Sequence, residues 1–593
     1  MPVNDVVIRV GGDSAEGGVV VTGEIIAKVL ARCGLEVFTF HTNPAEIKGG
    51  PVMIQVRSGE QTIHSTGDWA DILICFNDEA WAQNGSYLRE TGVLIYDSSF
   101  EPDEVRKRLP KYPNAPKVPK RTTRYALPFK EIAKEMRVPI AKNCVIMGTL
   151  SQFFGIPKEK FVEVFKQRWG NRGEKVIETN VRALDAGINA AREIEKTDPL
   201  RFEPQPLKDR IFINGNEALC LGAVEAGCQM FAGYPITPAT SILSWMEEHL
   251  PRFGGMAIQV EDEICSIGSV IGASYAGKKS MTATSGPGLS LMIEFFGLAA
   301  MAEVPCIIVN AMRGGPSTGL PTKTEQGDLN IAAWAGHGDV SRVVLAPSTV
   351  QGCFYTIIHA FNLAEICQVP VIVLTDTALA NRNQTLPPID LDVVRVADRA
   401  TPTDGEATNG YKRYSLEGNG ASPMSAPGRP GTYVATGLEH DEYGHPNWDP
   451  DNHRLMTEKR FKKLDMALNY NTFYPQFNPV SWYGPRQADI GIISWGSTGG
   501  AVREAELRAR EEGHSVACLH VTMLNPLPAR QIREFIRACR RVIIPELNYM
   551  GQFARLVKSH IPCDPVQINE ATGLPIPVDE ILQTIREVSQ YGG

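Results

Sequence analysis

The sequence FAGYPITPAT (231–240) opens a stretch that decides the fold and continues as IQVEDEICSIGSVIGASYAGKKSMTATSGPGLSLM (258–292) and VPCIIVNAMRGGPSTGLPTKTEQGD (304–328). Short apolar runs in this stretch are typical of buried parallel strands, and a turn rich in glycine or proline follows each run. In an open α/β sheet such turns lie at the carboxyl ends of the strands, where ligands bind. We therefore expect several separate turns to meet in one crevice.

A polar residue stands at each of these turns. Glu261 and Glu263 follow the run AIQV, and Ser285 follows KSMTAT. Arg313 follows CIIVNAM, and Thr237 follows a predicted helix. Each turn also has a structural explanation of its own. YPITP could be a rigid proline turn, SGPG an ordinary connection, and Glu263 a charge that suits the first turn of a helix. Their combined spacing favours one shared site.

Four segments together resemble the alpha subunit of the 2-oxoacid:ferredoxin oxidoreductases, namely YPITP, VEDE, TATSGPG and RGGPSTGLPT. The similarity extends to both ends of the chain. It is greatest to the form in which a gamma-type domain precedes the alpha chain, as in 2-oxoglutarate:ferredoxin oxidoreductases. The resemblance implies an enzyme that oxidatively decarboxylates a 2-oxoacid on thiamine diphosphate, passes the electrons to ferredoxin and transfers the acyl group to coenzyme A.

The resemblance also implies roles for individual residues. Glu263, rather than Glu261, would contact the aminopyrimidine ring of thiamine diphosphate. Thr237 would lie near the reacting carbonyl group, and Arg313 would bind the substrate carboxylate. A guanidinium suits that task because its planar fork matches a carboxylate, although Arg313 could instead form a salt bridge under the glycine turn. The cofactor-binding residues that the resemblance implies are Tyr234, Pro235, Ile236, Thr237, Glu263, Ser285 and Gly286.

A second chain is expected to complete the site. Thiamine diphosphate is commonly held through a divalent metal by a G-D-G…N-N motif, and neither Asp13 in GGDS nor Asp339 in GHGDV fits that motif. No two of the 12 cysteines are three residues apart, so the chain lacks the C-x-x-C spacing of iron–sulfur ligands. We expect no metal site in this chain. The resemblance places Mg²⁺ and a [4Fe-4S] cluster on a beta subunit, in an assembly of two alpha and two beta chains.

Several alternatives stay open. The order of a gamma-type domain followed by the alpha chain favours 2-oxoglutarate, but pyruvate and branched-chain 2-oxoacids are further possibilities. A thiamine-dependent 2-oxoacid dehydrogenase subunit that transfers acyl groups to lipoamide is another. A fourth alternative, from a different class, is a non-catalytic subunit that binds a nucleotide or coenzyme A and retains only a vestige of the Glu263 site.

Length, composition and charge limit the number of domains, the class of protein and its partners. A length of 593 residues suggests about four domains, at ~150 residues each. The hydrophobic share of 43% is that of a globular protein, and no apolar run reaches the ~20 residues of a membrane span. The start MPVNDVVIRV carries no basic leader. The net charge is −8 without a basic cluster, which disfavours nucleic acid as a partner. We expect a cytoplasmic protein with no membrane contact.

The chain is expected to divide into five parts, of which the three domains are of the α/β class and are built on parallel sheets. Strands and helices alternate to about residue 194, and the proline- and charge-rich segment EKTDPLRFEPQPLKDR then reads as a linker. The predicted parts are a gamma-type domain (1–194), a linker (195–210), a pyrimidine-type thiamine diphosphate domain (211–382), an irregular extension (383–486) and a transketolase C-terminal-like domain (487–593).

Three further motifs allow two interpretations each. The turn with Gly11, Gly12, Gly17 and Gly18 could bind a phosphate at a helix N-terminus or serve only tight turns. Together with the later turn AEIKGG (45–50), it resembles the gamma domain of the same family. GSTGG could likewise bind an anion or serve packing. The segment 438–453 is rich in His, Asp and Glu, which are metal-ligand types. Its spacing matches no ordered metal motif, and a comparable segment occurs in the resembling alpha chains, so a structural loop is favoured.

Overall fold

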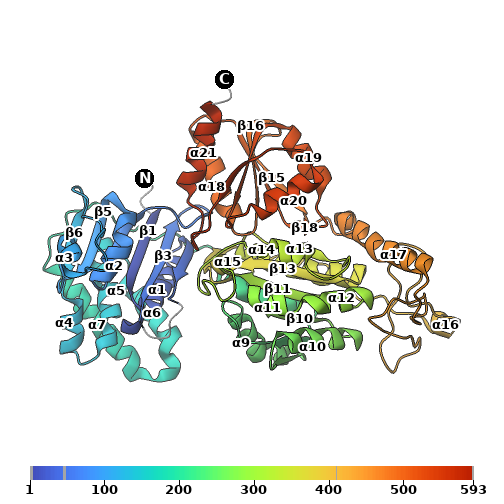
Figure 1. Ribbon diagram of the computed structural model, residues 1–593. Coiled ribbons are helices and arrows are strands. Elements are labelled where there is room, and N and C mark those ends of the chain that lie inside the picture. Colours follow the sequence, from blue (N-terminus) through green and yellow to red (C-terminus); the bar gives the residue numbers. More distant parts are fainter. Residues whose placement is uncertain (1–4, 45–48, 409, 591–593) are drawn as a thin grey trace. The chain divides into compact units, whose positions relative to one another are not determined.

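In a computed structural model of the protein, residues 5–44, 49–408 and 410–590 are described. The chain divides into two compact units, Met1–Ile213 with Arg382–Pro388 and Asn214–Asn381 with Ile389–Gly593. The five-part division expected from the sequence is finer than this, and its boundaries stay predictions. Mostly parallel sheets with helices packed against them confirm the α/β class (Figure 1).

The first unit is built on an eight-stranded sheet in the order β6-β5-β4-β1-β3-β2-β14-β7. β1, β4, β5 and β6 run parallel, whereas β3 is antiparallel to both β1 and β2. The segment between β2 and β3 is too short for a crossover helix, so these strands form a hairpin. The strands are β1 (Val6–Asp13), β2 (Glu36–Thr42), β3 (Pro51–Gly59), β4 (Ala70–Cys75), β5 (Leu88–Asp97), β6 (Thr123–Leu127), β7 (Ile211–Ile213) and β14 (Gln384–Leu386).

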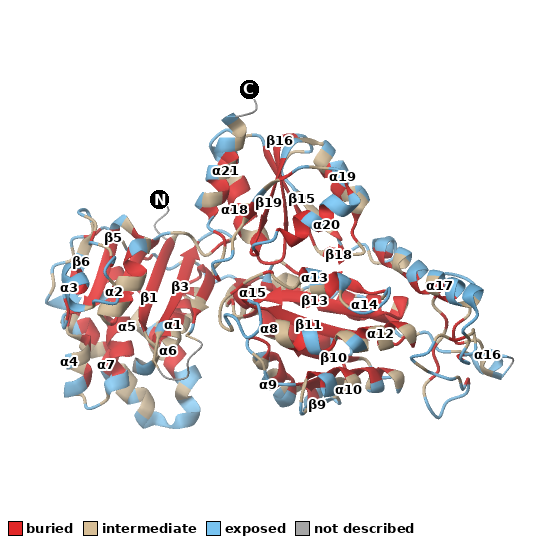
Figure 2. Ribbon diagram, viewed as in Figure 1, coloured by how far each residue is buried: buried red, intermediate tan, exposed pale blue. Residues whose placement is uncertain are grey.

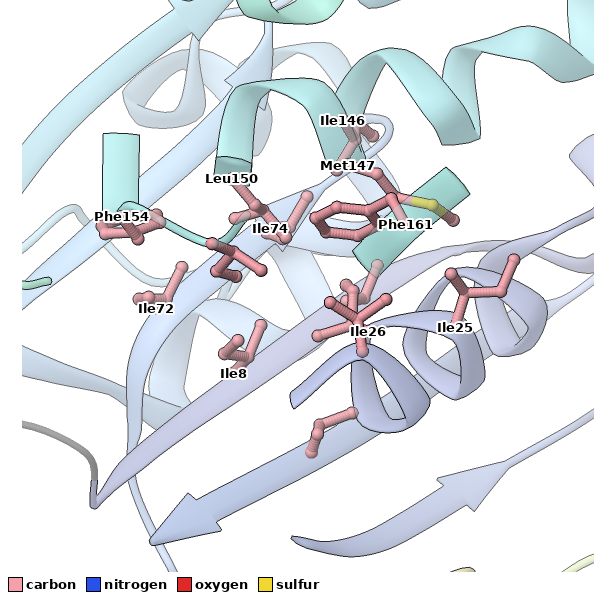
Figure 3. Close-up of a cluster of buried hydrophobic side chains, with 14 of the residues drawn as sticks. Ile8, Ile25, Ile26, Ile72, Ile74, Ile146, Met147, Leu150, Phe154 and Phe161 are labelled. Carbon is pink, nitrogen blue, oxygen red and sulfur yellow. The ribbon is translucent and has the colours of Figure 1, made fainter. Parts of the chain in front are cut away.

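Helices of the first unit cover its sheet and enclose a large apolar core and a smaller one around Trp81. They are α1 (Val19–Arg32), α2 (Asp78–Asn84), α3 (Val105–Arg108), α4 (Phe129–Glu135), α5 (Lys142–Phe154), α6 (Lys158–Trp169) and α7 (Glu174–Arg192). Figure 3 shows Ile8, Ile72 and Ile74 of the sheet beside Leu150 and Phe161 of the helices. Charged side chains are also buried in this unit, among them Arg9 and Asp71.

Two short strands lie elsewhere than the sequence predicts. Residues 211–213 were expected to open the second α/β unit, yet β7 pairs antiparallel with β14 at the edge of the first sheet. β14 itself comes from the segment 383–486 that was expected to be irregular, and it pairs with β2. Its Thr385 accepts a hydrogen bond from the backbone N–H of Val37, at 2.8 Å. No local pattern in three-residue strands reveals so distant a partner.

The second unit contains a seven-stranded sheet in the order β18-β12-β13-β11-β10-β8-β9. From β12 to β9 every neighbouring pair is parallel. Its strands are β8 (Met230–Gly233), β9 (Met256–Gln259), β10 (Ser280–Thr284), β11 (Cys306–Met312), β12 (Val343–Leu345), β13 (Pro370–Asp376) and β18 (Met523–Asn525). The helices around it are α8 (Gly215–Glu225), α9 (Thr240–His249), α10 (Glu263–Tyr275), α11 (Gly286–Leu291), α12 (Ile293–Met301), α13 (Leu329–Trp334), α14 (Val350–Cys367) and α15 (Thr377–Ala380).

A five-stranded sheet of order β15-β17-β16-β19-β20 forms the C-terminal part of the same unit. Its strands are β15 (Val480–Tyr483), β16 (Ala488–Trp495), β17 (Val516–Val521), β19 (Cys539–Glu546) and β20 (Val566–Asn569). Its helices are α18 (Thr498–Glu511), α19 (Ala529–Arg537), α20 (Gln552–His560) and α21 (Val578–Gln590). The central strands β16 and β17 are buried while the helices expose one face, as Figure 2 shows. β18 leaves this part of the chain to join β12 of the seven-stranded sheet.

The segment expected to be an irregular extension contains a long helix, α17 (Pro450–Leu468), besides the short helix α16 (Asp404–Thr408). The buried positions of α17 follow helical spacing, but three of the five are charged: Met456, Lys459, Arg460, Lys463 and Ala467. An amphipathic helix is predicted from an apolar stripe. Here the inward stripe is cationic, so the hydrophobic period that would have revealed the helix is missing. Within the described ranges, no helix is long and apolar enough to cross a membrane.

Candidate active site

Four parallel strands of the seven-stranded sheet end at the same edge. β11, β10, β8 and β9 are neighbours in that order, so the turns that follow them lie together, as the sequence predicts. One detail differs. The turn with Thr237 follows strand β8 and not a helix, because α8 ends at Glu225 and Gly227, with φ of 84°, turns the chain into the strand.

Glu263 is the buried carboxylate of this edge. It is the first residue of α10, which Asp262 caps by accepting a hydrogen bond from the Cys265 N–H at 2.7 Å. The Glu263 side chain is only 6% exposed, whereas Glu261 is exposed. Within the described parts of the chain, no hydrogen bond reaches the Glu263 carboxylate. Its charge is thus available for a group that the chain itself does not supply.

The first turn of α11 packs directly on that carboxylate. A Cβ atom at Gly288 would lie 2.5 Å from Glu263 Oε1 and 2.1 Å from Thr284 Oγ1, so only glycine fits there. Ser285, which precedes α11, is fully buried, and its hydroxyl has no hydrogen-bond partner among the described residues. A buried hydroxyl without a partner is costly, so it indicates a polar group that is bound at this point.

Arg313 follows β11 and reaches the neighbouring turn. Its guanidinium donates a hydrogen bond to the backbone carbonyl of Thr237, at 2.8 Å. The Arg313 side chain is buried, and its Nε has no partner within the described ranges. Burial lowers the pKa of Arg313, and the nearby Asp328 opposes that shift. No salt bridge of Arg313 occurs among the described residues, so the guanidinium keeps capacity to bind an anion.

Asp328 and Asn310 belong to this edge, although the sequence singled out neither. Asn310 Nδ2 donates to Asp328 Oδ2 at 2.8 Å. A Cβ atom at Gly286 would lie 3.0 Å from the same oxygen. Burial raises the pKa of Asp328, against the effects of Asn310 and Arg313. Asp328 follows a loop and not a strand, so the rule of polar residues at strand ends could not find it.

A cavity of about 850 Å³ lies beside Arg313 and Asp328, and Glu263, Ser285 and Thr237 are not among its lining residues. Gly286, Arg313 and Asp328 line one part of it, and another part is lined by Asn548 and by Gln552, the first residue of α20. The C-terminal part of the chain therefore supplies part of the wall. Sequence reasoning missed this contribution, because NYMGQ (548–552) matches no binding motif.

The predicted cofactor loop lies largely at the surface of this chain. Tyr234, Pro235 and Thr237 are exposed, and Ile236 is half-buried. Tyr234 is 40% exposed. The side chains of Glu263 and Ser285 are buried under the same sheet edge, so the edge combines a buried polar part with an open apolar one.

The other motifs serve structural contacts. Glu439 in the segment 438–453 accepts hydrogen bonds from both Arg460 terminal nitrogens and contacts His453, while His440 lies 2.9 Å from the Leu438 carbonyl. Among the described residues no group of His, Cys, Asp and Glu could hold a metal ion.

Two of the glycine turns are also tightly packed. A Cβ atom at Gly12 would lie 2.6 Å from Val19, and one at Gly499 would lie 2.7 Å from His520. These contacts favour the packing interpretation of the glycine turn in the first unit and of GSTGG. Residues 45–48 of AEIKGG lie outside the described residues.

Three family models match the chain. Residues 221–459 match "Pyruvate flavodoxin/ferredoxin oxidoreductase, thiamine diP-bdg", residues 7–190 match "Pyruvate ferredoxin/flavodoxin oxidoreductase", and residues 488–576 match "Pyruvate:ferredoxin oxidoreductase core domain II". These matches identify an oxidoreductase with a thiamine diphosphate-binding domain. The buried carboxylate at the sheet edge lies within that domain.

Individual relatives make the assignment narrower. Subunit alpha of 2-oxoacid:ferredoxin oxidoreductase 1 from Aeropyrum pernix is 32% identical over 99% of this chain and 98% of its own length. The 2-oxoglutarate oxidoreductase subunit KorA of Mycobacterium tuberculosis is 32% identical over 98% of this chain and 91% of its own. This chain belongs to the 2-oxoacid:ferredoxin oxidoreductases, enzymes of the EC 1.2.7 type, and the family predicted from the sequence motifs is confirmed.

A solved structure of high similarity agrees with this family assignment. The 2-oxoglutarate:ferredoxin oxidoreductase of Magnetococcus marinus, solved with 2-oxoglutarate, coenzyme A and succinyl-CoA bound, superposes with a TM-score of 0.91. It is 42% identical to this chain, and the match covers 99% of both chains.

Proposed function

We propose that this chain is the alpha subunit of a 2-oxoglutarate:ferredoxin oxidoreductase. The reaction joins the acyl group of 2-oxoglutarate to coenzyme A, releases carbon dioxide and transfers two electrons to ferredoxin. The observation that carries the proposal is the 42% identity, over 99% of both chains, to the Magnetococcus marinus enzyme that has 2-oxoglutarate and succinyl-CoA bound. Arg313 beside a cavity of about 850 Å³ supports it, since that space accommodates a small dicarboxylate.

The residues of the sheet edge fit thiamine diphosphate. The Glu263 carboxylate and the Ser285 hydroxyl are buried and have no partner among the described residues, and the α11 backbone at Gly288 packs against Glu263. When bound, the cofactor supplies a nucleophilic carbon and stabilises the negative charge left by decarboxylation. We propose that Tyr234, Pro235, Ile236, Thr237, Glu263, Ser285 and Gly286 hold its pyrimidine half.

Two side chains carry the chemistry that this chain would contribute. Glu263 would share a proton with ring atom N1′ of the aminopyrimidine, which activates the amino group on that ring as a base. Arg313 would bind the substrate carboxylate through its unoccupied guanidinium positions. Its bond to the Thr237 carbonyl would fix the two turns relative to each other, which keeps Thr237 near the reacting carbonyl group.

A partner chain is part of the proposal. The sequence lacks a G-D-G…N-N motif and C-x-x-C pairs, so we place Mg²⁺, the diphosphate half-site and a [4Fe-4S] cluster on a beta subunit. The exposed Tyr234, Pro235 and Thr237 support a surface that the partner covers. We further propose two alpha and two beta chains, with ferredoxin as electron acceptor and coenzyme A as co-substrate. The cytoplasmic location stays a prediction from sequence.

The function is tested on the complex that copurifies with a tagged form of this chain. We expect CoA-dependent reduction of a low-potential acceptor with 2-oxoglutarate, an iron–sulfur spectrum in the complex, and no activity from this chain alone. The assay panel includes pyruvate and a branched-chain 2-oxoacid, with lipoamide as a competing acyl acceptor. Preference for another 2-oxoacid would overturn the proposed substrate, and transfer to lipoamide would overturn coenzyme A as the acyl acceptor. Turnover by the isolated chain would overturn the need for a partner subunit.

Substitution of Arg313 by Lys is expected to weaken substrate binding. Lysine keeps the positive charge but loses the planar fork that pairs with a carboxylate. A hydrogen bond to a charged group contributes roughly 1.5–3 kcal/mol, so KM for the 2-oxoacid should rise about ten- to a hundred-fold. The measurement is steady-state kinetics, with the exposed Arg540 changed to Lys as the matched control. Unchanged KM and kcat in Arg313→Lys would show that Arg313 only supports the loop.

A further inference from the structure

The end of the loop after β11 is fixed to the C-terminal part of the chain by Gln326. This side chain is fully buried. Its Nε2 donates to the Trp495 carbonyl at 2.8 Å, and its Oε1 accepts from the Leu547 N–H at 3.0 Å. The Gln326 backbone N–H donates to the Leu547 carbonyl at 2.7 Å, and the Gln326 carbonyl accepts from Asn548 Nδ2 at 3.2 Å. All hydrogen-bonding groups of Gln326 thus point into the C-terminal part.

Gln552 makes the opposite connection. It is the first residue of α20 and is 8% exposed. Its Nε2 donates to the Gly327 carbonyl at 2.7 Å, and its Oε1 accepts from the Asn330 N–H at 2.9 Å. The two ends of one amide therefore hold the backbone on both sides of Asp328. Gln326 and Gln552 together form what we call the glutamine clamp.

A buried carboxylate fixes the C-terminal side of the clamp. Glu546 is fully buried and accepts hydrogen bonds from the N–H groups of Phe553 and Ala554, at 2.8 and 2.9 Å. It also accepts one from Asn548 Nδ2, at 2.9 Å. Asn548 Oδ1 in turn accepts from the Gln552 N–H at 3.1 Å. The start of α20 is therefore held rigidly where it meets the loop.

The residue that the clamp encloses lines the site. Asp328 lies between the two points that Gln552 holds, accepts a hydrogen bond from Asn310, and lines the same cavity as Arg313. Neither glutamine belongs to the residues assigned to the cofactor, and Gln552, unlike Gln326, is itself among the residues that line the cavity. We propose that the glutamine clamp is a positioning device that fixes Asp328 and the loop from Arg313, so that the C-terminal part of the chain governs 2-oxoacid binding. This inference rests on the proposed function for its substrate.

The test uses the copurified complex with Gln552 changed to Leu, which keeps the volume and removes both hydrogen bonds. Two lost hydrogen bonds should raise KM for 2-oxoglutarate roughly five- to a hundred-fold, while kcat stays within about twofold because no group at the cofactor changes. Hydrogen–deuterium exchange should speed up at the Asn330 amide, whose acceptor is Gln552 Oε1. The matched control is Gln583→Leu on α21, where the amide donates a hydrogen bond at the surface to Glu587 and to no other described residue.

A second variant keeps the test independent of folding. In Gln552→Glu, a carboxylate oxygen would face the Gly327 carbonyl at neutral pH, whereas a protonated carboxyl group would donate to it as Gln552 does. The ratio of its KM to that of the wild type should therefore fall as the pH is lowered. A contact that only stabilises the fold would not give this ratio a pH dependence.

The outcomes separate this inference from the proposed function. Faster exchange at Asn330 together with raised KM and near-constant kcat supports the positioning role. An unchanged KM in Gln552→Leu, in a complex whose wild type is active, overturns it even if exchange speeds up. A wild-type complex that oxidises no 2-oxoacid overturns the proposed function instead.

Discussion

The complex with Glu263→Gln is expected to assemble, keep its iron–sulfur colour and bind thiamine diphosphate, yet turn over about 10²- to 10⁴-fold more slowly, the usual loss when an acid–base group is removed. Glutamine has nearly the same shape, so it fits against Gly288 in the space that Glu263 occupies. It cannot share a proton with N1′ of the aminopyrimidine. Exchange of the cofactor C2 proton with solvent deuterium, measured by NMR after a rapid quench, should slow together with turnover.

The matched control for this prediction is Glu261→Gln. Glu261 precedes the same helix but is exposed, so its loss should change exchange and turnover by less than about twofold. Wild-type C2 exchange in Glu263→Gln would move the proton-sharing role to another group, with Glu261 the first to examine. Loss of cofactor binding without any effect on exchange in the remaining bound fraction would also contradict the proposed role.

Among the variants considered, Glu303→Gln is expected to lower the free energy of unfolding most. Glu303 has φ of 52° and a fully buried carboxylate, which pairs with Lys459 Nζ at 2.6 Å and Lys463 Nζ at 3.0 Å. Removal of the carboxylate would leave two buried ammonium groups without their counter-charge. Breaking a buried pair in this way costs about 3–5 kcal/mol, so the calorimetric transition of the second unit should move to clearly lower temperature.

The control is Glu458→Gln on the same helix. Glu458 pairs with Arg454, and both side chains are more than half exposed. Exposed pairs contribute about 0–1 kcal/mol, so the transition should hardly move. An equally small shift for Glu303→Gln would show that the cationic face of α17 is stable without its carboxylate.

The same cluster predicts a pH dependence of stability. Burial acts to raise the pKa of Glu303, but the charges of Lys463, Lys459 and Arg413 outweigh it and hold that pKa well below its usual range. A group with a lowered pKa in the folded state stabilises fully above its ordinary value, about 4.3 for Glu. This stabilisation is lost as the pH falls below that value toward the folded pKa. Glu303→Gln should therefore lose less stability than the wild type on acidification from neutral pH.

The sequence by itself determined the family, the fold class and the edge of the sheet where the candidate site lies. These conclusions rest on local patterns: apolar runs that end in glycine or proline turns, with Glu263, Ser285 and Arg313 at the ends of parallel strands. The geometry of a parallel sheet brings such ends together without any knowledge of tertiary contacts. The choice of Glu263 over Glu261 came from the resemblance, and the burial of Glu263 agrees with it.

Only the tertiary structure decided which distant segments complete the cavity. Asp328 follows a loop, and Gln552 lies in a part of the chain without a binding motif, so their approach has no local signal. α17 was missed for a different physical reason. Its inward face carries Lys459 and Lys463 where an apolar stripe is expected, and these charges are tolerated only because the buried Glu303 lies opposite. Hydrophobic periodicity leaves a repeat in the sequence, whereas the long-range pairing of polar groups leaves none. These pairings are therefore found only in the tertiary structure.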